Sequence, residues 1–310
     1  MNGSEIIDKT ILVTGGAGFI GSHLVDSLVD GNQIYVLDDL SGGRREWIHR
    51  DAEFIEGDIR DEVLLREAMA EVDIVFHEAA QVNVTASSRA PRETHEINTT
   101  ATLSLLERAH ETGARVVLAS STAVYGDPDT LPVAESHRTA PLSPYGVSKL
   151  ASDHYARVFD ALFSCEAIPL RYFNVYGPRQ SGGQYSGVVD VFVRQAIDGD
   201  PLTIHGDGSQ TRDFVHVSDV VNANRLAAVT EATGEPFNVA TGTSCTVREL
   251  AELIIELTES NSDIVHTEPR NGDVMQSEGD IAKSRDILGY QPSVSLEEGL
   301  RELVGWYRST

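Results

Sequence analysis

Short runs of apolar, often β-branched residues alternate with longer segments of helical periodicity along the N-terminal part of the chain. Ile20, Leu24 and Leu28, for example, recur at the spacing of one helix face. Strands are expected near residues 10–14, 33–38, 53–56, 73–77, 115–120, 166–172 and 237–239, and helices near 19–30, 61–70, 92–111, 144–163 and 187–198. Strands that alternate with helices across short loops predict an α/β fold with a parallel, doubly wound sheet.

Beyond about residue 172 the alternation weakens, and loops that contain Gly and Pro become frequent. We therefore expect a second, smaller lobe built from several segments of the chain. Residues Phe214 to Val239 are expected to return to the main sheet.

A glycine-rich turn follows the first predicted strand. The sequence from Gly15 to Gly21 reads GGAGFIG, and the second predicted strand ends at Asp38. In this strand, turn and helix pattern the glycines let the backbone approach a pyrophosphate, and the helix N-terminus attracts its charge. An acid about 20 residues on would bind a ribose diol. The pattern predicts a dinucleotide site.

Asp38 favours NAD over NADP, because a carboxylate repels a 2′-phosphate. Arg44 and Arg45 are the counter-argument, since they follow Gly42-Gly43 and are within reach of such a phosphate. A solvated loop is the alternative interpretation of these arginines, and we prefer it.

Tyr145 and Lys149 are four residues apart, behind Ser143 and Pro144. Serine is a favoured N-cap, and proline suits the first helical position. Side chains four apart lie on one helix face, so a phenol and an ammonium would project together. The ammonium would favour the phenolate and give a tyrosine base at neutral pH. A half-buried Tyr with a solvated Lys is the alternative.

The spacing of Gly15, Gly18 and Gly21, combined with Tyr145 and Lys149, resembles the extended short-chain dehydrogenase/reductase family. The likeness covers nearly the whole chain and is strongest to the UDP-hexose 4-epimerases. It implies a Rossmann-type NAD domain over residues 1–172 plus 214–241, and a C-terminal nucleotide-sugar lobe over 173–213 plus 242–310. It also implies a cytoplasmic homodimer that associates through two helices per subunit.

The resemblance assigns roles to particular residues. Alignment on Val124-Tyr125-Gly126 places Ser121 beside Tyr145 and Lys149 as the catalytic hydroxyl. The implied NAD-binding residues are Gly15, Gly18, Phe19, Ile20, Asp38, Asp39, Ser41, Gly42, Asp58, Ile59, Ala79, Ala80, Gln81, Asn98, Tyr145, Lys149 and Phe173. The implied UDP-sugar-binding residues are Ser121, Tyr145, Asn174, Val188, Arg212, Arg270, Asp273 and Ser277. A helix cap is the alternative for Asp58, and surface ion pairs are the alternative for Arg212 and Arg270.

Thr122-Ala123 discriminates among the reactions of the resembled family. Related 4,6-dehydratases carry Asp-Glu at these positions, and related UDP-glucuronate decarboxylases carry Glu at the position of Ala123. Alanine supplies neither an acid nor a base, so 4-epimerisation of a UDP-hexose is the expected reaction. Another nucleotide-sugar enzyme (a UDP-glucuronate epimerase, dehydratase or reductase) and a non-catalytic NAD-sensing protein remain the alternatives.

Ser277 bears on which sugar is accepted. Counted from Arg270 and Asp273, it falls where epimerases confined to plain hexoses carry a bulky Tyr. Relatives that accept N-acetylhexosamines carry a small residue there. UDP-glucose and UDP-galactose are the expected substrates, and Ser277 would extend the range to UDP-N-acetylglucosamine and UDP-N-acetylgalactosamine. A Ser that caps a turn before Asp280 is the alternative.

Composition adds the most through its charge. The 310 residues include 48 Asp and Glu against 24 Lys and Arg, a net charge of −24. Such a surface makes nucleic acid and anionic membranes poor partners. The cysteines, Cys165 and Cys245, have no metal-type spacing and fit a reducing cytoplasm, and no metal site, membrane span or signal peptide is expected. The lysines are Lys9, Lys149 and Lys283, and a Lys-poor, uniformly acidic chain suggests adaptation to a salty cytoplasm.

We predict that folding needs molar salt. The Debye length grows from ~3 Å at 1 M to ~30 Å at 0.01 M salt, so the surplus of acidic side chains repels itself at low ionic strength. Thermal melting measured across KCl concentrations should show a melting temperature that rises with salt. A melting temperature that is insensitive to salt contradicts the halophilic interpretation.

Overall fold

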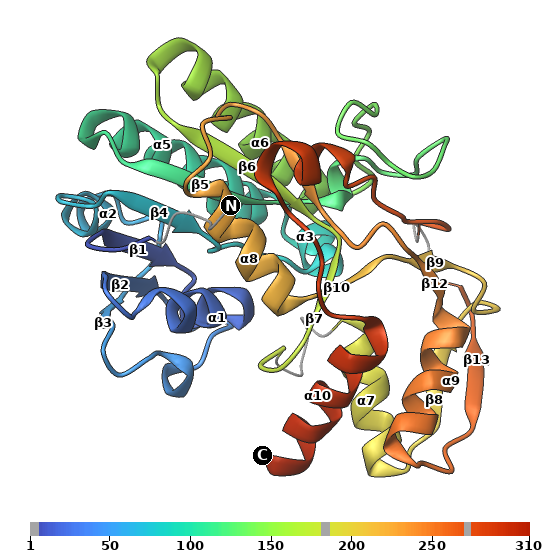
Figure 1. The fold of residues 1–310 in the computed structure, drawn as a ribbon. Helices are drawn as coiled ribbons and strands as arrows, with labels where there is room; N and C mark the ends of the chain where they lie inside the picture. Colours follow the sequence, from blue (N-terminus) through green and yellow to red (C-terminus); the bar gives the residue numbers. More distant parts are fainter. Residues whose placement is uncertain (1–5, 181–186, 270–273) are drawn as a thin grey trace.

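A computed structural model describes residues 6–180, 187–269 and 274–310 (Figure 1). Its centre is a seven-stranded sheet with the strand order β3-β2-β1-β4-β5-β6-β11, and every pair of neighbours is parallel. The strands are β1 (Thr10–Thr14), β2 (Gln33–Asp38), β3 (Glu53–Glu56), β4 (Ile74–His77), β5 (Arg115–Ser121), β6 (Ala167–Tyr172) and β11 (Phe237–Val239). The expected α/β fold is confirmed, with strand bounds within one residue of the prediction.

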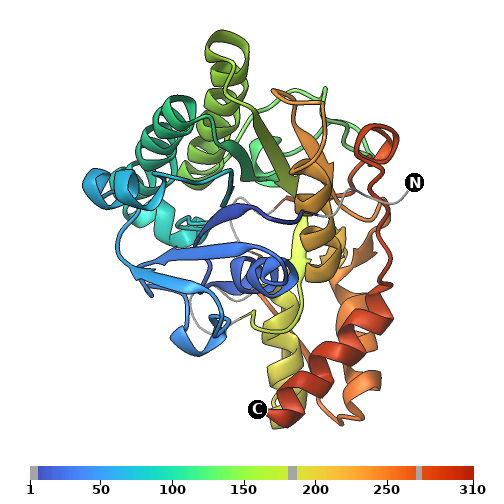
Figure 2. The ribbon, with the colours of Figure 1, turned by 60° about the vertical axis from the view of Figure 1, so that its left-hand side comes forward.

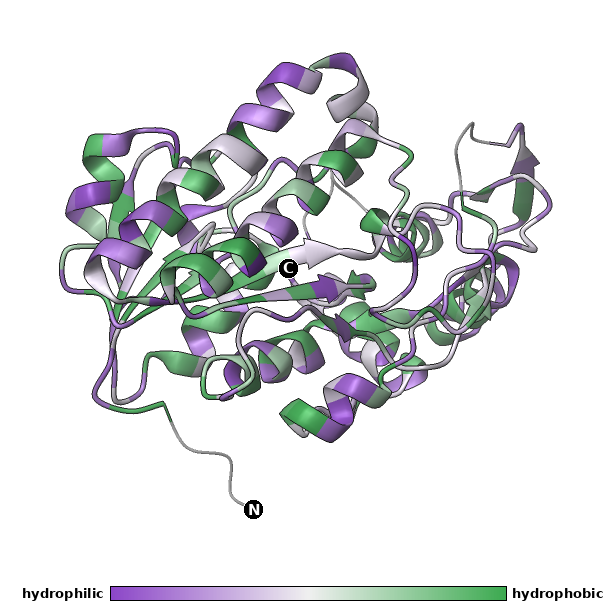
Figure 3. Cartoon of the chain, turned by 90° about the horizontal axis from the view of Figure 1, so that it is seen from above, coloured by the Kyte–Doolittle hydropathy of each residue, from purple (hydrophilic) through white to green (hydrophobic). Residues whose placement is uncertain are grey.

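Helices cover both faces of the sheet, as a doubly wound fold requires. On one face lie α1 (Phe19–Leu28) and α8 (Val217–Ala227), whose apolar residues share a core with β1, β6 and β11. On the other lie α2 (Glu62–Ala68), α5 (Ala101–Thr112) and α6 (Pro144–Phe163). Figure 2 shows the sheet between these layers, and Figure 3 shows hydrophobic and hydrophilic residues alternating along the covering helices.

The helix predicted over 92–111 is interrupted. It consists of α4 (Pro91–His95), a π-helical segment η2 (Glu96–Thr100) and α5, and it follows the short helix α3 (Val84–Arg89). A π-helical turn inserts a residue into the helix, and such turns occur frequently at functional sites. The periodicity of the sequence gave no warning of this insertion.

A second lobe has a core of its own. It contains α7 (Val188–Asp198), α9 (Val247–Thr258) and α10 (Leu296–Ser309), which pack together beside the paired strands β8 (Leu202–His205) and β13 (Ile264–Thr267). Figures 1 and 2 both show these helices together at the end that holds the C-terminus. The helices α8, α9 and α10 were not predicted. Capping boxes that begin at Thr246 for α9 and at Ser295 for α10 were available signals in the sequence.

Two small strand pairs join the lobe to the main sheet. β7 (Asn174–Tyr176) pairs with β10 (Phe214–His216), and β9 (Thr211–Arg212) pairs with β12 (Cys245–Thr246). The expected return of residues 214–239 to the sheet is therefore correct only for β11, because β10 pairs with β7 instead. The shorter helical segments are η1 (Arg45–Trp47), η3 (Thr122–Val124) and η4 (Ser284–Leu288).

Candidate active site

The glycine turn after β1 is built for close backbone contact. Gly15 has φ +70°, which favours glycine, and a Cβ there would lie 2.7 Å from the Ala79 nitrogen. A Cβ on Gly21 would lie 2.2 Å from the Gly15 oxygen. The turn therefore packs directly against the loop after β4 and lets α1 begin close to β1. This cradle fits a pyrophosphate at the N-terminus of α1.

A cavity of about 540 Å³ opens at this edge of the sheet. It lies at the carboxyl ends of β1, β2, β3 and β4, where the strand order reverses and doubly wound proteins bind dinucleotides. Most of the predicted NAD-binding residues line it, namely Gly15, Gly18, Phe19, Ile20, Asp38, Asp39, Ser41, Gly42, Asp58, Ile59, Ala79, Ala80 and Gln81.

Asp38 ends β2 inside this cavity. Its Oδ2 accepts a hydrogen bond from the Ala17 nitrogen at 3.0 Å, and its Oδ1 accepts one from the Leu40 nitrogen at 2.8 Å. Burial raises the pKa of the carboxyl, and the two backbone donors oppose that rise. Each oxygen keeps a second acceptor position. Asp38 thus supports the glycine turn and remains available to a ribose diol.

The arginines that argued for NADP are engaged elsewhere. Arg44 forms an ion pair with Glu46 at 3.3 Å, and Arg45 forms one with Glu56 at 3.1 Å. All four side chains are largely exposed. This arrangement agrees with the solvated loop that we preferred.

At the far end of the cavity Asp58 is paired with Arg60, whose Nε donates to Asp58 Oδ1 at 2.9 Å. Hydrogen bonds from Arg60 lower the pKa of the Asp58 carboxyl. Arg60 also lines the cavity, and the sequence analysis missed it. The available signal was the position of Arg60, two residues after Asp58 in the loop that follows β3.

The predicted catalytic residues meet where α6 begins beside the end of β5. Ser143 caps α6 by accepting a hydrogen bond from the Gly146 nitrogen at 3.0 Å, as its sequence predicts. Ser121 is the last residue of β5, and its hydroxyl acts to lower the pKa of the Tyr145 phenol. Lys149 is only 4% exposed, and its Nζ donates to the Ala119 oxygen at 2.8 Å.

The charges around Tyr145 differ from the expectation. Burial raises the pKa of the phenol, the Ser121 hydroxyl lowers it, and the charge of Glu78 raises it further. Lys149 is not among these influences. Burial lowers the pKa of Lys149 to about 8, while Glu78 acts to raise it. In this structure the ammonium is therefore balanced by Glu78 rather than by a tyrosine anion.

Glu78 is a second cavity residue that was not predicted from the sequence. It follows β4, lines the cavity, and its Oε1 accepts a hydrogen bond from the Tyr172 hydroxyl at 2.8 Å. Burial raises its pKa to about 7, although Tyr172 and Lys149 both act to lower it. An acid among the small residues at a strand end was the signal in the sequence.

Two predicted NAD-binding residues stand behind the cavity wall. Asn98, in the π-helical segment, accepts from the Gln81 nitrogen at 2.8 Å and donates to the Gln81 oxygen at 2.9 Å. It also donates to Ser148 Oγ at 3.0 Å, so it ties the cavity loop to α6. Phe173 is buried in a small cluster with Val124 and Tyr125. Their direct contact with NAD stays a prediction.

The predicted sugar-binding residues lie on several elements of the second lobe. Asn174 begins β7, Val188 begins α7, and Arg212 ends β9. Arg212 lines a second cavity of about 440 Å³, and Ser277 is buried with 7% exposure. Arg270 and Asp273 lie outside the described residues.

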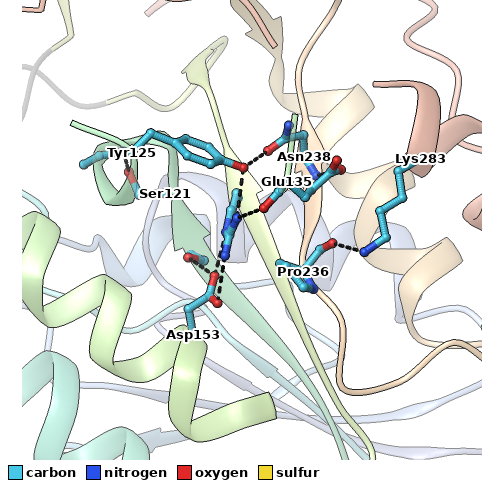
Figure 4. A network of polar contacts seen from close by, with 10 residues as sticks. Ser121, Tyr125, Glu135, Asp153, Pro236, Asn238 and Lys283 are labelled. Carbon is cyan, nitrogen blue, oxygen red and sulfur yellow. Dashed lines mark hydrogen bonds and ion pairs between the residues drawn. The ribbon is translucent and has the colours of Figure 1, made fainter. Parts of the chain in front are cut away.

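A buried polar network supports the catalytic helix (Figure 4). Asp153 of α6 forms an ion pair with Arg171 of β6, with Arg171 Nε 2.8 Å from Asp153 Oδ2. The Arg171 guanidinium also donates to the Tyr125 hydroxyl at 3.0 Å and to the backbone carbonyl oxygen of Glu135 at 3.1 Å. The Tyr125 hydroxyl donates to Asn238 Oδ1 at 2.7 Å. The network joins α6 to β5, β6 and β11.

Two further searches cover only the part of the chain that the structure describes. Within it, no group of three or more His, Cys, Asp and Glu side chains is placed to hold a metal ion. Nor does it contain a helix with the length and apolar character needed to cross a membrane.

The fold and the cavity define a dinucleotide-binding α/β enzyme, in which Ser121, Tyr145 and Lys149 lie at the end of β5 and the start of α6 rather than in the cavity lining. The model of the NAD dependent epimerase/dehydratase family matches residues 11–240, and the chain belongs to that family. The family is NAD dependent, and NAD is the cofactor of this chain.

Three relatives illustrate the likeness. UDP-glucose 4-epimerase of Mycolicibacterium smegmatis is 39% identical over 96% of this chain and 98% of its own. The structure of UDP-glucose 4-epimerase from Thermotoga maritima with UDP-glucose is 40% identical, with a TM-score of 0.94 over 97% and 99% of the two chains. UDP-N-acetylglucosamine 4-epimerase from Methanobrevibacter ruminantium is 36% identical, with a TM-score of 0.94 over 98% and 99%. Nucleotide-sugar decarboxylases and dehydratases also match.

We predict that Asp38→Ala weakens NAD and improves tolerance of NADP, because the ribose acceptor and the charge that repels a 2′-phosphate are removed together. Loss of a hydrogen bond to a charged group corresponds to roughly 10- to 100-fold in affinity. Titration of the apoprotein with both cofactors measures the change. Asp61→Ala, which removes the exposed cap of α2, is the control and should leave both affinities unchanged. Unchanged selectivity in Asp38→Ala would put the nucleotide elsewhere.

Proposed function

We propose that this protein catalyses the NAD-dependent 4-epimerisation of a UDP-hexose through a transient 4-keto sugar. The expected substrate pair is UDP-glucose and UDP-galactose. The observation that carries the proposal is the placement of Ser121, Tyr145 and Lys149 at the end of β5 and the start of α6, where Glu78 of the cavity wall acts on both Tyr145 and Lys149. An enzyme that oxidises and then reduces the same carbon needs a base, a hydroxyl partner for it and a nearby cofactor, and nothing else.

Each residue then has a defined task. Tyr145 takes the proton of the 4-hydroxyl and later returns it, and Ser121 hydrogen-bonds the oxygen that changes charge. Lys149 holds the nicotinamide ribose. When NAD is bound, the chemistry available in the site is reversible hydride exchange with C4 of the sugar. The 4-keto sugar would turn over before the hydride returns, and this turn inverts the configuration at C4. Because C4 regains the hydride and the proton that it lost, the net reaction is redox-neutral and consumes no NAD.

Thr122 and Ala123 favour epimerisation over the other reactions of the family. They lie in η3, directly after Ser121. Elimination or decarboxylation needs an acid or a base near C5 and C6, and neither side chain provides one at neutral pH. A UDP-glucuronate epimerase, dehydratase or reductase remains the alternative, and a non-catalytic NAD-sensing role is disfavoured by the intact catalytic set.

The second lobe would hold the nucleotide sugar. We propose residues 1–172 plus 214–241 as the NAD domain, and 173–213 plus 242–310 as the substrate lobe, which is supported by the separate core around α7, α9 and α10. Asn174, Val188, Arg212 and Ser277, together with Arg270 and Asp273, would contact UDP and the sugar. The planar guanidinium of arginine suits a diphosphate.

We also propose a homodimer that associates through α5 and α6. Apolar side chains on α6 support it, since Val158, Leu162 and Phe163 are all exposed. The two cysteines are free thiols, which fits work in a reducing cytoplasm. In a salty cytoplasm the excess of acids would keep the surface solvated.

Ser277 supports a second substrate pair, UDP-N-acetylglucosamine and UDP-N-acetylgalactosamine. It is buried with 7% exposure, and a serine there occupies less space beside a bound sugar than a tyrosine would. The 36% identity to the Methanobrevibacter ruminantium enzyme favours the same extension.

Tyr145→Phe should reduce turnover by ~10²–10⁴-fold and leave NAD bound, because it removes the proton acceptor and little volume. Conversion of UDP-glucose, UDP-N-acetylglucosamine and UDP-glucuronate by the purified protein, with its NAD content, measures both effects. Tyr155→Phe is a matched control, because Tyr155 lies on the exposed face of the same helix and should keep full activity. Activity of Tyr145→Phe at the wild-type level would end the proposed mechanism.

Ser277→Tyr should reduce turnover of UDP-N-acetylglucosamine far more than that of UDP-glucose, because the ring would fill the space beside C2 of the sugar. Rates on the two substrates, measured with one preparation, give the comparison. Equal losses on both, or a wild-type protein without activity on the acetylated sugar, would contradict the wider specificity.

A further inference from the structure

Asp213 is a fully buried acid that the proposed mechanism does not use. It follows Arg212 directly and connects β9 to β10, which Figure 1 labels. We propose that Asp213 is a positioning residue for the nucleotide-sugar site, which fixes the segments that carry Asn174 and Ser277 relative to Arg212. The inference rests on the proposed function, because that function makes these three residues substrate contacts.

The Asp213 carboxylate gathers two distant segments. Its Oδ1 accepts hydrogen bonds from the Thr241 nitrogen at 2.8 Å and from Thr241 Oγ1 at 2.7 Å. Its Oδ2 accepts from the Gly242 nitrogen at 3.0 Å and from the Gly279 nitrogen at 3.2 Å. Residues 241–242 follow β11 of the main sheet, and Gly279 lies two residues after Ser277. One side chain therefore holds the Ser277 segment against the end of the sheet.

The backbone of Asp213 orients the third element. Its carbonyl oxygen accepts from the Asn174 nitrogen at 3.1 Å and from Asn174 Nδ2 at 3.1 Å. The pairing of Phe214 with Asn174 continues this contact along β7 and β10. A shift of Asp213 would therefore move the Asn174 side chain as well.

The Ser277 segment has little freedom to settle in another place. A Cβ on Gly279 would lie 2.6 Å from Ala240 Cβ and 2.9 Å from Phe173 Cζ, so the chain passes close to both. Glu278 accepts from Ser244 Oγ at 2.7 Å, and its carbonyl oxygen accepts from the Val133 nitrogen at 2.8 Å. The segment is thus tight, and the Asp213 carboxylate is its anchor on the substrate-lobe side.

The four donors around the Asp213 side chain require two acceptor oxygens, which a carboxylate provides. Burial raises the pKa of Asp213, and the bonds from Thr241, Gly279 and Gly242 lower it. The isosteric Asn offers one oxygen and one NH₂ group. Its NH₂ group would face N–H donors on whichever side it pointed, so Asp213→Asn breaks the clamp at nearly constant volume.

Asp219 supplies a matched control six residues along the chain. It is also buried, and it also accepts from backbone and side-chain donors: the Ser293 nitrogen at 2.9 Å, Ser293 Oγ at 2.8 Å and the Val294 nitrogen at 3.2 Å. Its clamp holds the loop before α10, which lines the same cavity as Arg212 but carries none of the residues proposed as substrate contacts, so Asp219→Asn tests whether loosening another wall of that cavity weakens UDP binding. Asp219→Asn therefore removes the same kind of interaction from another segment.

The experiment compares wild type, Asp213→Asn and Asp219→Asn as purified, NAD-containing proteins. Calorimetric titration measures the affinity for UDP, and the melting temperature and the NAD content show whether the fold is retained. We expect Asp213→Asn to bind UDP roughly 10-fold or more weakly, and Asp219→Asn to stay within about twofold of wild type, with NAD retained in both. Unchanged UDP affinity in Asp213→Asn, or an equal loss in Asp219→Asn, overturns the inference.

Two further outcomes are distinguishable. A wild-type protein that holds NAD but does not bind UDP defeats the proposed function and this inference with it. If Asp213→Asn does not yield folded protein, Thr241→Val removes one of the four donors and keeps the shape of the side chain. Thr241→Val should lower the affinity for UDP by about threefold or more, and an unchanged affinity overturns the role of Asp213.

Discussion

The buried ion pair between Asp153 and Arg171 is the contact on which the catalytic arrangement depends. Both side chains are almost completely excluded from solvent, and two further donors of Arg171 reach the Tyr125 hydroxyl and the Glu135 oxygen. Asp153 lies one turn after Lys149 on α6, so the pair sets the distance between that helix and the sheet. Removal of one partner from such a buried pair leaves an unpaired charge and costs about 3–5 kcal/mol. The constraint explains how a surface helix can present Tyr145 to a fixed point.

The electrostatics of the site follow from that rigidity. Burial raises the pKa of Glu78 and lowers that of Lys149, each opposes the shift of the other, and Tyr145 lies in surroundings that raise the pKa of its phenol. A tyrosine that is buried next to an acid is a poor base by itself. A bound oxidised nicotinamide, which carries a positive charge, would act to lower the pKa of the Tyr145 phenol.

Local signals were enough to predict the frame of this site. The glycine turn, Asp38 at a strand end and the cap of α6 each depend on neighbours in sequence, and the structure has them where the pattern indicated. Glu78 and Asp213 could not be assigned in this way, because their partners Tyr172 and Gly279 are far along the chain. The π-helical turn could not be predicted because it breaks the periodicity of its helix. The helices α9 and α10 did carry a local signal, since each begins with a capping box.

The central claim is that one carbon of the sugar loses and regains the same hydride. Incubation of the purified protein with UDP-glucose deuterated at C4, without added NAD, tests it directly by NMR and mass spectrometry of the products. The account predicts UDP-galactose that retains deuterium at C4, because a hydride held on the nicotinamide carbon does not exchange with water and the cofactor would stay bound. Product that has exchanged the label for solvent hydrogen, or the absence of any C4 epimer, would contradict it.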